Sequence, residues 1–466
     1  MVNIKSIPKS KKKSYLNRNK HNNIIIIGGG ISGLNLAYKL VKNGMKNITI
    51  IESSNRLGGR ISTIKFRNET YESGAGRFNN KQKRLMSLLK NFKLLNKSIP
   101  IDKAPELILS PFNKYQELSY FSDIDTPMKI IKLVEKMKTN GKISTTELIN
   151  NSLLDIVDKK LNTKYPKISN ILEDTFHYWS EIAVLNAYDA LQLFKKDFNF
   201  NKTFYILKGG LYQIIDKLKE YLKKNGVKII LNTHIDTIVE NNNSYLLNNS
   251  YLCKYLILAI PKHNLIKFKI LNPILKKLNS VKEEPLYRIY AKYPLDKDGK
   301  VWFEKIPKIS TNLPIKFIIP YNKKTGLIMI SYTDGKYAKY WLNKMSKGIL
   351  EDELDKQLNK LFKYVNIPKP IWIKHHYWNY GAAYWKVGIE SKKMIKNVIQ
   401  PFNNSKNIYI CGENYSSHQA WIEGALQTSD LVSDLIIKKF KNNFMDKSKS
   451  KNMNNSKKIS KKNKYK

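Results

Sequence analysis

Apolar and amphipathic stretches divide the start of this 466-residue chain into a strand, a helix and a second strand. Four consecutive isoleucines at 24–27 predict a short buried β-strand, because β-branched side chains are stiff and suit a covered sheet. Residues 32–43 place apolar side chains on one face of a predicted helix, which Gly44 is suited to end. A second apolar strand is predicted at 47–52. This order is typical of a Rossmann-like unit.

The same patterns predict further elements along the chain. Apolar runs indicate strands at 227–231, 255–260, 327–332 and 407–411, and helical spacing indicates helices at 129–138, 211–224, about 350–363, and from Gly424 onward. No internal repeat is visible. No apolar run approaches the roughly 20 residues that span a bilayer, and the N-terminus carries no apolar signal region.

Three glycines connect the first strand to the first helix, and each suits a different requirement of a nucleotide site. Gly28 permits a tight turn, Gly30 lets backbone N–H groups approach a pyrophosphate, and Gly33 lets the helix pack closely on the strand. The positive end of the helix would face the phosphates. Glu52 closes the second strand, where a carboxylate accepts the ribose hydroxyls. The sequence therefore predicts a dinucleotide site, the alternative being a glycine-rich structural turn.

Three further blocks narrow the choice of dinucleotide. The first is Arg56-Leu57-Gly58-Gly59-Arg60, and the second is Tyr71-Glu72-Ser73-Gly74-Ala75-Gly76-Arg77-Phe78. The third lies near the C-terminus in two parts, Tyr409-Ile410-Cys411-Gly412-Glu413-Asn414 and Ala420-Trp421-Ile422-Glu423-Gly424-Ala425-Leu426. Over about residues 22–440, this set resembles the flavin-containing amine oxidase family of monoamine, polyamine and L-amino acid oxidases. The resemblance implies bound FAD, which supplies the redox chemistry while the protein orients it.

The resemblance also implies the fold and the domains. We expect an α+β fold, with a discontinuous α/β FAD-binding domain of Rossmann-like type and a substrate domain of mixed sheet and helices. The FAD-binding domain is expected from 22–80, 200–262 and 400–440, and the substrate domain from 81–199 and 263–399, with the active site between them. Residues 1–21 and 441–466 lack an apolar face and are expected to be disordered basic tails.

Cofactor contacts follow from the family as well. The resemblance assigns Gly59, Arg60 and Gly412 to the cofactor, and Ile235 lies in the segment whose backbone meets the adenine. Glu413 is expected to bond the ribityl or pyrophosphate region, and the helix near Glu423 to aim its N-terminus at the flavin N1–C2=O edge. Ala383 stands where monoamine oxidases carry a cysteine bonded to the flavin. Alanine cannot form that bond, so non-covalent FAD is expected.

Four residues are candidates for the chemistry. Tyr384 and Trp421 match two aromatic residues that stand perpendicular to the flavin in monoamine oxidases and align the amine, the alternative being core packing. Arg77 matches an arginine that binds the substrate carboxylate in L-amino acid oxidases; the alternatives are a contact with the flavin or its phosphates, or a structural ion pair. Arg288 stands where the family carries a lysine that holds a water at the flavin N5, although an arginine cannot release a proton.

Other polar residues in the sequence indicate no further chemistry. His375 and His376 are adjacent on a predicted strand and point to opposite faces, so no metal site is expected. His418 is expected in a loop or at the surface, the alternative being that it reaches the pocket from its place three residues before Trp421. Cys253 and Cys411 fall inside predicted strands, which argues against a disulfide framework and favours a reducing compartment.

The formal net charge of +46 is extreme. Residues 1–20 contribute +7 and residues 438–466 contribute +11, which leaves +28 on the rest of the chain. The basic tails could bind polyanions non-specifically. The alternative is biased coding, since Lys, Asn and Ile are enriched together, as in the AT-rich genomes of some giant DNA viruses and protists.

These observations predict an FAD-dependent amine oxidase. A primary amine or L-amino acid would react with oxygen to give an imine, which hydrolyses to an aldehyde or keto acid and ammonia, with hydrogen peroxide as the second product. Polyamines are less favoured, because a basic body repels polycations. The alternatives are a dehydrogenase or desaturase of the same superfamily and a flavoprotein that binds polyanions. An intracellular, cytoplasmic location is expected, or packaging in a virion if the source is a giant DNA virus.

Overall fold

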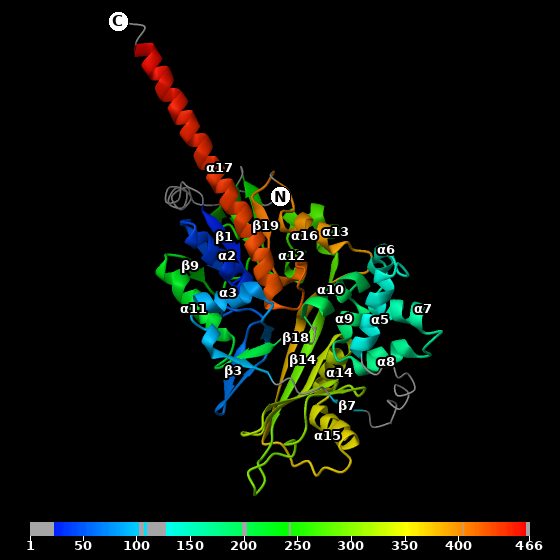
Figure 1. Ribbon diagram of the computed structural model, residues 1–466. Helices are drawn as coiled ribbons and strands as arrows, with labels where there is room; N and C mark the ends of the chain where they lie inside the picture. The colour runs from blue at the N-terminus through cyan, green and yellow to red at the C-terminus, as the bar shows by residue number, and fades with distance from the viewer. Residues whose placement is uncertain are drawn as a thin grey trace.

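The computed structural model describes residues 23–101, 107–109, 127–197, 203–241, 244–403 and 405–462. The expected N-terminal tail therefore lies outside the described residues. Within them the fold is α+β, as predicted, and is built around two sheets (Figure 1). No helix among the described residues is long and apolar enough to cross a membrane.

The first sheet is entirely parallel and has the order β19-β13-β1-β2-β9. Its strands are β1 (Ile24–Ile27), β2 (Ile48–Ile51), β9 (Lys228–Ile230), β13 (Tyr255–Leu258) and β19 (Ile408–Ile410). The strands β1 and β13 are apolar and buried throughout, since other elements cover them: α2 (Ile31–Lys42) contacts β1, and β11 (Ser244–Leu247) contacts β13. The chain turns to one side of β1 through β2 and returns on the other side through β13. Ligands bind at such a reversal point, outside the carboxyl ends of the strands.

Three helices pack beside this sheet. They are α2 (Ile31–Lys42), α11 (Tyr212–Lys224) and α17 (Ile422–Lys462), and α2 contacts both of the others. The Asn35 side chain on α2 donates to Ser429 Oγ (2.7 Å) and Asp430 Oδ1 (3.0 Å) on α17, which fixes the two helices against each other. The helix α17 continues past residue 440, where the sequence analysis expected a disordered tail to begin. Neither glycine nor proline follows Gly424, so no residue in the sequence breaks this helix.

The second sheet has six strands in the order β18-β14-β17-β16-β15-β7. They are β7 (Leu107–Leu109), β14 (Val281–Lys292), β15 (Ile309–Thr311), β16 (Phe317–Asn322), β17 (Leu327–Asp334) and β18 (Trp372–Trp385), antiparallel except for the β15–β7 pair. The register between β14 and β18 shifts between Glu284 and Leu286, at Pro285, which has no N–H to donate to a ladder. In Figure 1, β14 and β18 run from the body of this sheet toward the parallel sheet.

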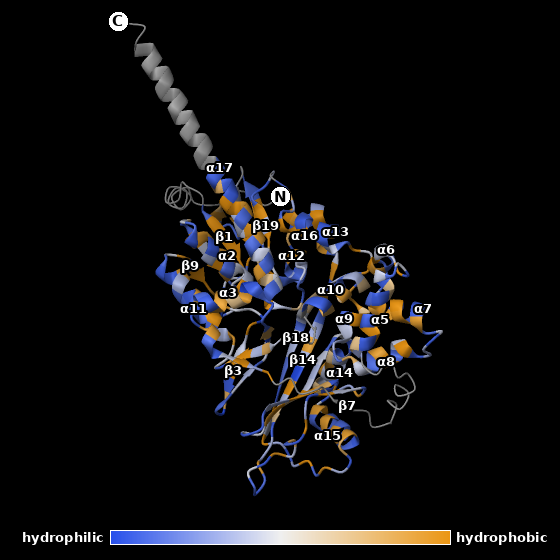
Figure 2. Cartoon of the chain, in the orientation of Figure 1, coloured by the Kyte–Doolittle hydropathy of each residue, from blue (hydrophilic) through white to orange (hydrophobic). Residues whose placement is uncertain are grey.

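Two groups of helices pack against the second sheet. A cluster labelled α5 to α10 gathers on one side of Figure 1, while α14 (Gly335–Ser346) and α15 (Leu350–Leu361) pack near the far end. The cluster consists of α5 (Pro127–Thr139), α6 (Thr145–Ile149), α7 (Leu153–Leu161), α8 (Ile168–Thr175), α9 (Trp179–Ala183) and α10 (Ala187–Asp197). Apolar residues concentrate between the layers in Figure 2, and one continuous core joins the parallel sheet to this cluster.

Short elements complete the described chain. They are β3 (Thr63–Phe66), β4 (Glu69–Glu72), β5 (Phe78–Asn79), α3 (Lys83–Asn91), η2 (Leu95–Lys97), β6 (Ser98–Pro100), β8 (Phe204–Leu207), β10 (Ile238–Asn241), β11 (Ser244–Leu247), β12 (Tyr251–Cys253), α12 (Lys262–Leu265), η3 (Lys269–Ile274), α13 (Leu275–Leu278), α16 (Ser391–Ile399) and η4 (Glu413–Tyr415).

Candidate active site

The glycine turn after β1 combines two tight contacts with one open position. A Cβ at Gly28, where φ is +106°, would lie 2.4 Å from the Ala259 carbonyl oxygen. A Cβ at Gly33 would lie 2.2 Å from the Gly28 carbonyl oxygen, so the helix can approach the strand only with glycine there. A Cβ at Gly30 would meet no atom within 4 Å. The first two glycines are therefore required by packing, whereas Gly30 borders open space at the start of α2.

Two more glycines border open space at the same edge of the sheet. The Gly58 N–H donates to the Gly29 carbonyl (2.9 Å), which docks the second glycine-rich loop on the first. Beside it, a Cβ at Gly59 would have only the Gly30 Cα within 4 Å, at 3.6 Å. Gly412 follows β19, and a Cβ there would meet nothing within 4 Å. After β1 and after β19, the backbone at Gly30 and Gly412 therefore borders open space with no side chain in between. A pyrophosphate needs such space to approach the backbone closely.

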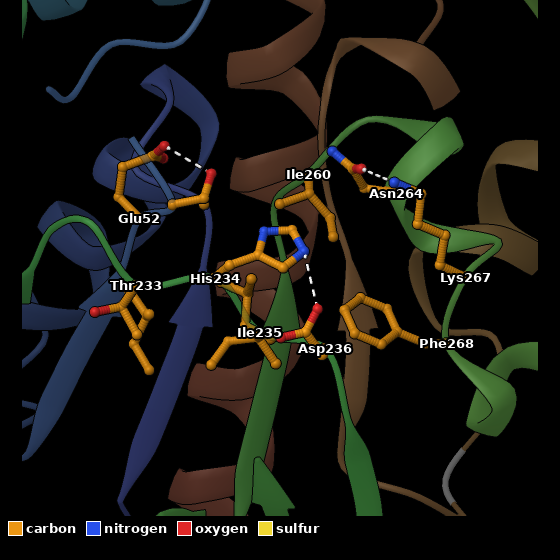
Figure 3. Close-up of a pocket in the computed structure, with 13 residues that line it drawn as sticks. Glu52, Thr233, His234, Ile235, Asp236, Ile260, Asn264, Lys267 and Phe268 are labelled. Carbon is orange, nitrogen blue, oxygen red and sulfur yellow. Dashed lines mark hydrogen bonds and ion pairs between the residues drawn. The ribbon is translucent and has the colours of Figure 1, made fainter. Parts of the chain in front are cut away.

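A pocket at the ends of β1 and β2 is shown in Figure 3. On one side, Glu52 Oε2 accepts from the Gly29 N–H (2.7 Å), and Oε1 accepts from the N–H (2.9 Å) and Oγ (2.8 Å) of Ser54. On the other side, Ile235 lies in a loop that the Asn248 side chain ties down through three bonds to the backbone of residues 234–237. The pocket has the place and the lining expected for an adenosine moiety.

The sequence analysis missed the third wall of this pocket. Lys267 and Phe268 close it from the segment after α12 (Figure 3). That segment was assigned to the substrate domain, and no local motif marks it. Only the chain reversal after β13 brings it beside Ile235.

Glu413 lies deeper in the structure and is held by protein groups on both oxygens. Its Oε2 accepts from Arg60 Nη1 (2.8 Å), which also donates to the Gly381 carbonyl (2.9 Å). Its Oε1 accepts from the N–H groups of Ala383 (3.1 Å) and Ala420 (2.7 Å). The sequence analysis assigned both Glu413 and Arg60 to the cofactor. The structure places them in one network of hydrogen bonds that joins β18 to η4.

Glu423 also has a position that the sequence analysis did not expect. Its buried carboxylate accepts from the backbone N–H groups of Arg84 (3.2 Å) and Leu85 (3.1 Å) and from Arg84 Nη1 (3.1 Å). It therefore caps the N-terminus of α3, where Gln82 makes no capping bond of its own. The side chain stabilises a helix terminus and does not line the pocket described above.

Arg77 lies among aromatic rings. Its Nη2 donates to the Tyr178 hydroxyl, and its guanidinium lies 5.6, 5.2 and 5.9 Å from the ring centroids of Tyr178, Phe204 and Trp421. In the described part of the chain, no carboxylate forms an ion pair with Arg77. A cation held by aromatic rings and one neutral hydroxyl can bind an anionic group of a ligand.

Arg288 is a second cation, and it is buried on β14. Its Nη1 donates to the Glu72 carbonyl (2.9 Å), and its guanidinium lies 4.5 Å from the Tyr332 ring centroid. Burial acts to lower the pKa of Arg288, but the nearby hydroxyls of Tyr332 and Tyr290 outweigh it and raise that pKa above its ordinary value. Arg288 is therefore a permanent cation that cannot act as a base.

Tyr384 is the last but one residue of β18 and is buried. Burial, with Glu181 and Asp334 nearby, raises the pKa of Tyr384 well above its ordinary value, so the phenol stays protonated. Trp421 stands just before α17, and the Glu413 network holds the residues that precede both aromatics. Among the ring pairs of the described residues, Tyr384 and Trp421 do not stack on each other.

Other aromatic residues of β18 have structural partners. Trp385 is buried and donates to the Ser416 carbonyl (2.9 Å), Trp378 donates to the Ser73 carbonyl (2.7 Å), and Tyr380 stacks on His263. Burial lowers the pKa of His376 to about 4, so this imidazole is neutral near pH 7. Within the described ranges, no group of three His, Cys, Asp or Glu residues could hold a metal.

The aromatic surround of Arg77 could not be found from sequence. Tyr178 precedes α9, Phe204 lies on β8 and Trp421 precedes α17. Of the three, only Trp421 is marked by a sequence motif. Tyr178 and Phe204 carry no such signal in their own segments, and only tertiary folding brings the three rings together.

Comparisons with known proteins show which family the chain belongs to. A family model described as flavin containing amine oxidoreductase matches residues 31–437. An uncharacterized protein of Acanthamoeba polyphaga mimivirus is 22% identical over 87% of this chain and 92% of its own length. The L-amino-acid oxidase of the rattlesnake Crotalus adamanteus is 23% identical over 87% of this chain and 85% of its own. The structure of cyclohexylamine oxidase from Brevibacterium oxydans superposes with a TM-score of 0.67 at 13% identity, covering 90% of this chain and 99% of that one.

Proposed function

This chain belongs to the flavin-containing amine oxidoreductase family, and we propose that within it the protein is an FAD-dependent amine oxidase. Its substrate is a primary amine or an L-amino acid. Oxygen takes up the two electrons and becomes hydrogen peroxide, while the imine product hydrolyses to an aldehyde or keto acid and ammonia. The observation that carries this proposal is Arg77, a cation without a carboxylate partner in the described chain, set beside Trp421.

FAD fits the described site. Gly30, Gly59 and Gly412 leave room for a pyrophosphate, Glu52 is placed for the ribose, and Ile235 for the adenine. The flavin accepts two electrons from the substrate when bound. Non-covalent attachment is supported by Ala383, which has no thiol, and by the burial of both cysteines, Cys253 and Cys411. Burial raises the pKa of Cys411 to about 12, which leaves it an unreactive thiol.

The residues of the chain then have separate tasks. Arg77 binds the carboxylate of an amino acid through its guanidinium fork. Tyr384 and Trp421 orient the neutral amine and exclude water from it. Arg288 stays charged and contributes a fixed positive potential. No described side chain has to act as a strong base, since the amine loses its proton before it reacts.

A dehydrogenase of the same family is the second candidate, and Arg288 is the observation that favours it. Tyr332 and Tyr290 outweigh the effect of burial and hold this arginine in its charged form, whereas a lysine could release a proton and orient a water. A dehydrogenase would reduce an added electron acceptor much faster than it reduces oxygen.

The location of the protein is also a proposal: it lies in the cytoplasm or is packaged in a virion. The likeness to a mimivirus protein supports a viral source. We propose as well that the basic tails contact polyanions.

A peroxide-coupled screen tests the proposal. Purified protein is mixed with L-amino acids and with the amine that each would give on decarboxylation, under air and with an artificial electron acceptor. Peroxide production that depends on one of these substrates is expected. Flavin should be released intact by acid. Reduction of the acceptor without peroxide would favour the dehydrogenase, and no turnover with any amine or amino acid would refute both.

A further inference from the structure

The buried network around Glu413 connects the two residues proposed to orient the amine. Its Oε1 accepts from the N–H of Ala383 and the N–H of Ala420, at 3.1 and 2.7 Å. Ala383 directly precedes Tyr384, and Ala420 directly precedes Trp421. One carboxylate oxygen therefore joins two segments that are 37 residues apart at the positions where their aromatic side chains begin.

Gln419 makes a second connection on the other side of Tyr384. Its Oε1 accepts from the Trp385 N–H (2.8 Å), and its Nε2 donates to the Asn414 carbonyl (2.6 Å). Tyr384 is thus bracketed, since the N–H before it and the N–H after it both bond to side chains of the 413–421 segment. Both Glu413 and Gln419 are buried, so water does not compete for these bonds.

The backbone before Trp421 shows that this segment is constrained. Ala420 has a φ of +65°, a left-handed conformation that a residue with a Cβ adopts at an energetic cost. The Glu413 bond to its N–H holds it there. The direction in which Trp421 leaves the backbone therefore depends on a strained residue that the carboxylate fixes.

We propose that Glu413 and Gln419 are positioning residues that set the distance and angle between Tyr384 and Trp421. The inference rests on the proposed function of this aromatic pair. Glu413 acts on the substrate through two backbone N–H groups, in place of the direct cofactor contact that the sequence suggested. Its ion pair with Arg60 (2.8 Å) neutralises the charge that this task buries.

Two substitutions of Glu413 separate the acceptor from the charge. Glu413→Gln and Glu413→Leu both remove the ion pair with Arg60. Only glutamine keeps an oxygen that accepts from both N–H groups. Its NH2 then faces Arg60 Nη1, donor against donor, so Arg60, which is 30% exposed, has to turn toward water while it keeps the Gly381 carbonyl as an acceptor. We expect Glu413→Leu to lower kcat about 10- to 100-fold, with Glu413→Gln within about threefold of wild type.

Glu69→Gln is the matched control. Glu69 is 5% exposed, as Glu413 is, and it pairs with Lys292 at 2.7 Å but has no bond to the 383–385 or 413–421 segments. We expect wild-type kcat from this variant. Equal losses of kcat in Glu413→Gln and Glu413→Leu would overturn the proposal, because the charge would then be what matters. Loss of flavin from both variants would also overturn it in favour of a cofactor contact.

A readout that needs no substrate keeps the inference testable on its own. The seven tryptophans are replaced by 5-fluorotryptophan, and the Trp421 resonance in the 19F NMR spectrum is assigned with Trp421→Phe. We expect this resonance to move in Glu413→Leu and to stay in place in Glu413→Gln and Glu69→Gln. If wild type oxidised no amine, the proposed function would fail while this measurement still decided the positioning role. An unmoved resonance in Glu413→Leu would refute that role alone.

A second pair of variants serves if Glu413→Leu does not fold. Gln419→Leu removes the bond to the Trp385 N–H, and Gln357→Leu is its control. Gln357 is 4% exposed against 3% for Gln419, and its Oε1 likewise accepts one backbone N–H, from Ile315 at 2.9 Å. A lower kcat and a shifted Trp421 resonance are expected only in Gln419→Leu. Identical behaviour of the two variants would contradict the proposal.

Discussion

Gly30→Ala is expected to abolish flavin binding while leaving the fold intact. Gly30 has φ −70° and ψ 173°, which alanine adopts freely, and a Cβ there would meet no protein atom within 4 Å. Replacing glycine with alanine reduces the conformational freedom of the unfolded chain, which stabilises the folded protein by about 0.4–1 kcal/mol. Alanine is also a poorer N-cap for α2 than glycine, which destabilises the folded protein by a similar amount. We therefore expect the free energy of unfolding of the flavin-free protein to change by less than about 1 kcal/mol.

The effect on the flavin has a different cause. The added methyl group occupies the space through which the backbone would approach the pyrophosphate. A ligand present at 100 times its Kd stabilises the folded protein by about 2.7 kcal/mol. Wild type should show this gain on addition of FAD, and Gly30→Ala should not. Urea unfolding with and without FAD, together with flavin absorbance after gel filtration, measures both quantities.

Gly33→Ala is the matched control on the same helix. A Cβ there would lie 2.2 Å from the Gly28 carbonyl oxygen, well inside van der Waals contact, so α2 has to move away from β1. Such overpacking typically costs about 1–3 kcal/mol, and it should appear without FAD. Wild-type FAD affinity in Gly30→Ala would refute the placement of the pyrophosphate. An unfolded Gly30→Ala protein would show that the position is not open.

Three other substitutions test separate parts of the structure. Arg77→Lys should reduce kcat/KM for L-amino acids roughly 30- to 1000-fold, because losing the bidentate contact with the substrate carboxylate costs about 2–4 kcal/mol. The value for the decarboxylated amines should change far less. Equal losses for both kinds of substrate would exclude a carboxylate contact. Burial raises the pKa of Asp334 to about 6, so the folded protein binds its proton more tightly than the unfolded chain and loses stability as pH rises from about 4 to 6. Urea unfolding across this range should show wild type losing up to about 3 kcal/mol more than Asp334→Asn, and equal slopes would contradict the pKa shift. Ser152 and Asp155 form a capping box at α7, so Ser152→Ala should lower the free energy of unfolding by about 1 kcal/mol in thermal or urea denaturation, with no change in flavin content.

The backbone around the proposed nucleotide site could be predicted from sequence because its constraints are local. Isoleucines next to a glycine turn allow few other backbone paths, and the structure has β1, α2 and β2 within one or two residues of the predicted bounds. Tight contacts explain Gly28 and Gly33, and open space explains Gly30. The α+β fold and membership in the flavin-containing amine oxidoreductase family, both predicted from motifs, are confirmed.

The partners of polar side chains could not be predicted in this way. Glu413 and Glu423 were both assigned to the cofactor from the family resemblance, Glu413 directly after Gly412 and Glu423 at the start of a predicted helix. The structure shows one bonded to Ala383 and Ala420, and the other capping α3 more than 330 residues earlier in the chain. A carboxylate accepts bonds from whichever donors the fold brings to it, and those donors carry no signal in its own segment.

The same distinction holds for the chemistry of the protein. Its sequence by itself determined the glycine turn after β1, where we propose that a dinucleotide binds, since backbone geometry near a glycine turn depends on adjacent residues. Only the tertiary structure decided that Arg77 stands among Tyr178, Phe204 and Trp421, because these rings come from three separate segments. The environment of a charge depends on packing between distant parts of the chain, and that packing follows from burying all apolar faces of the protein at once.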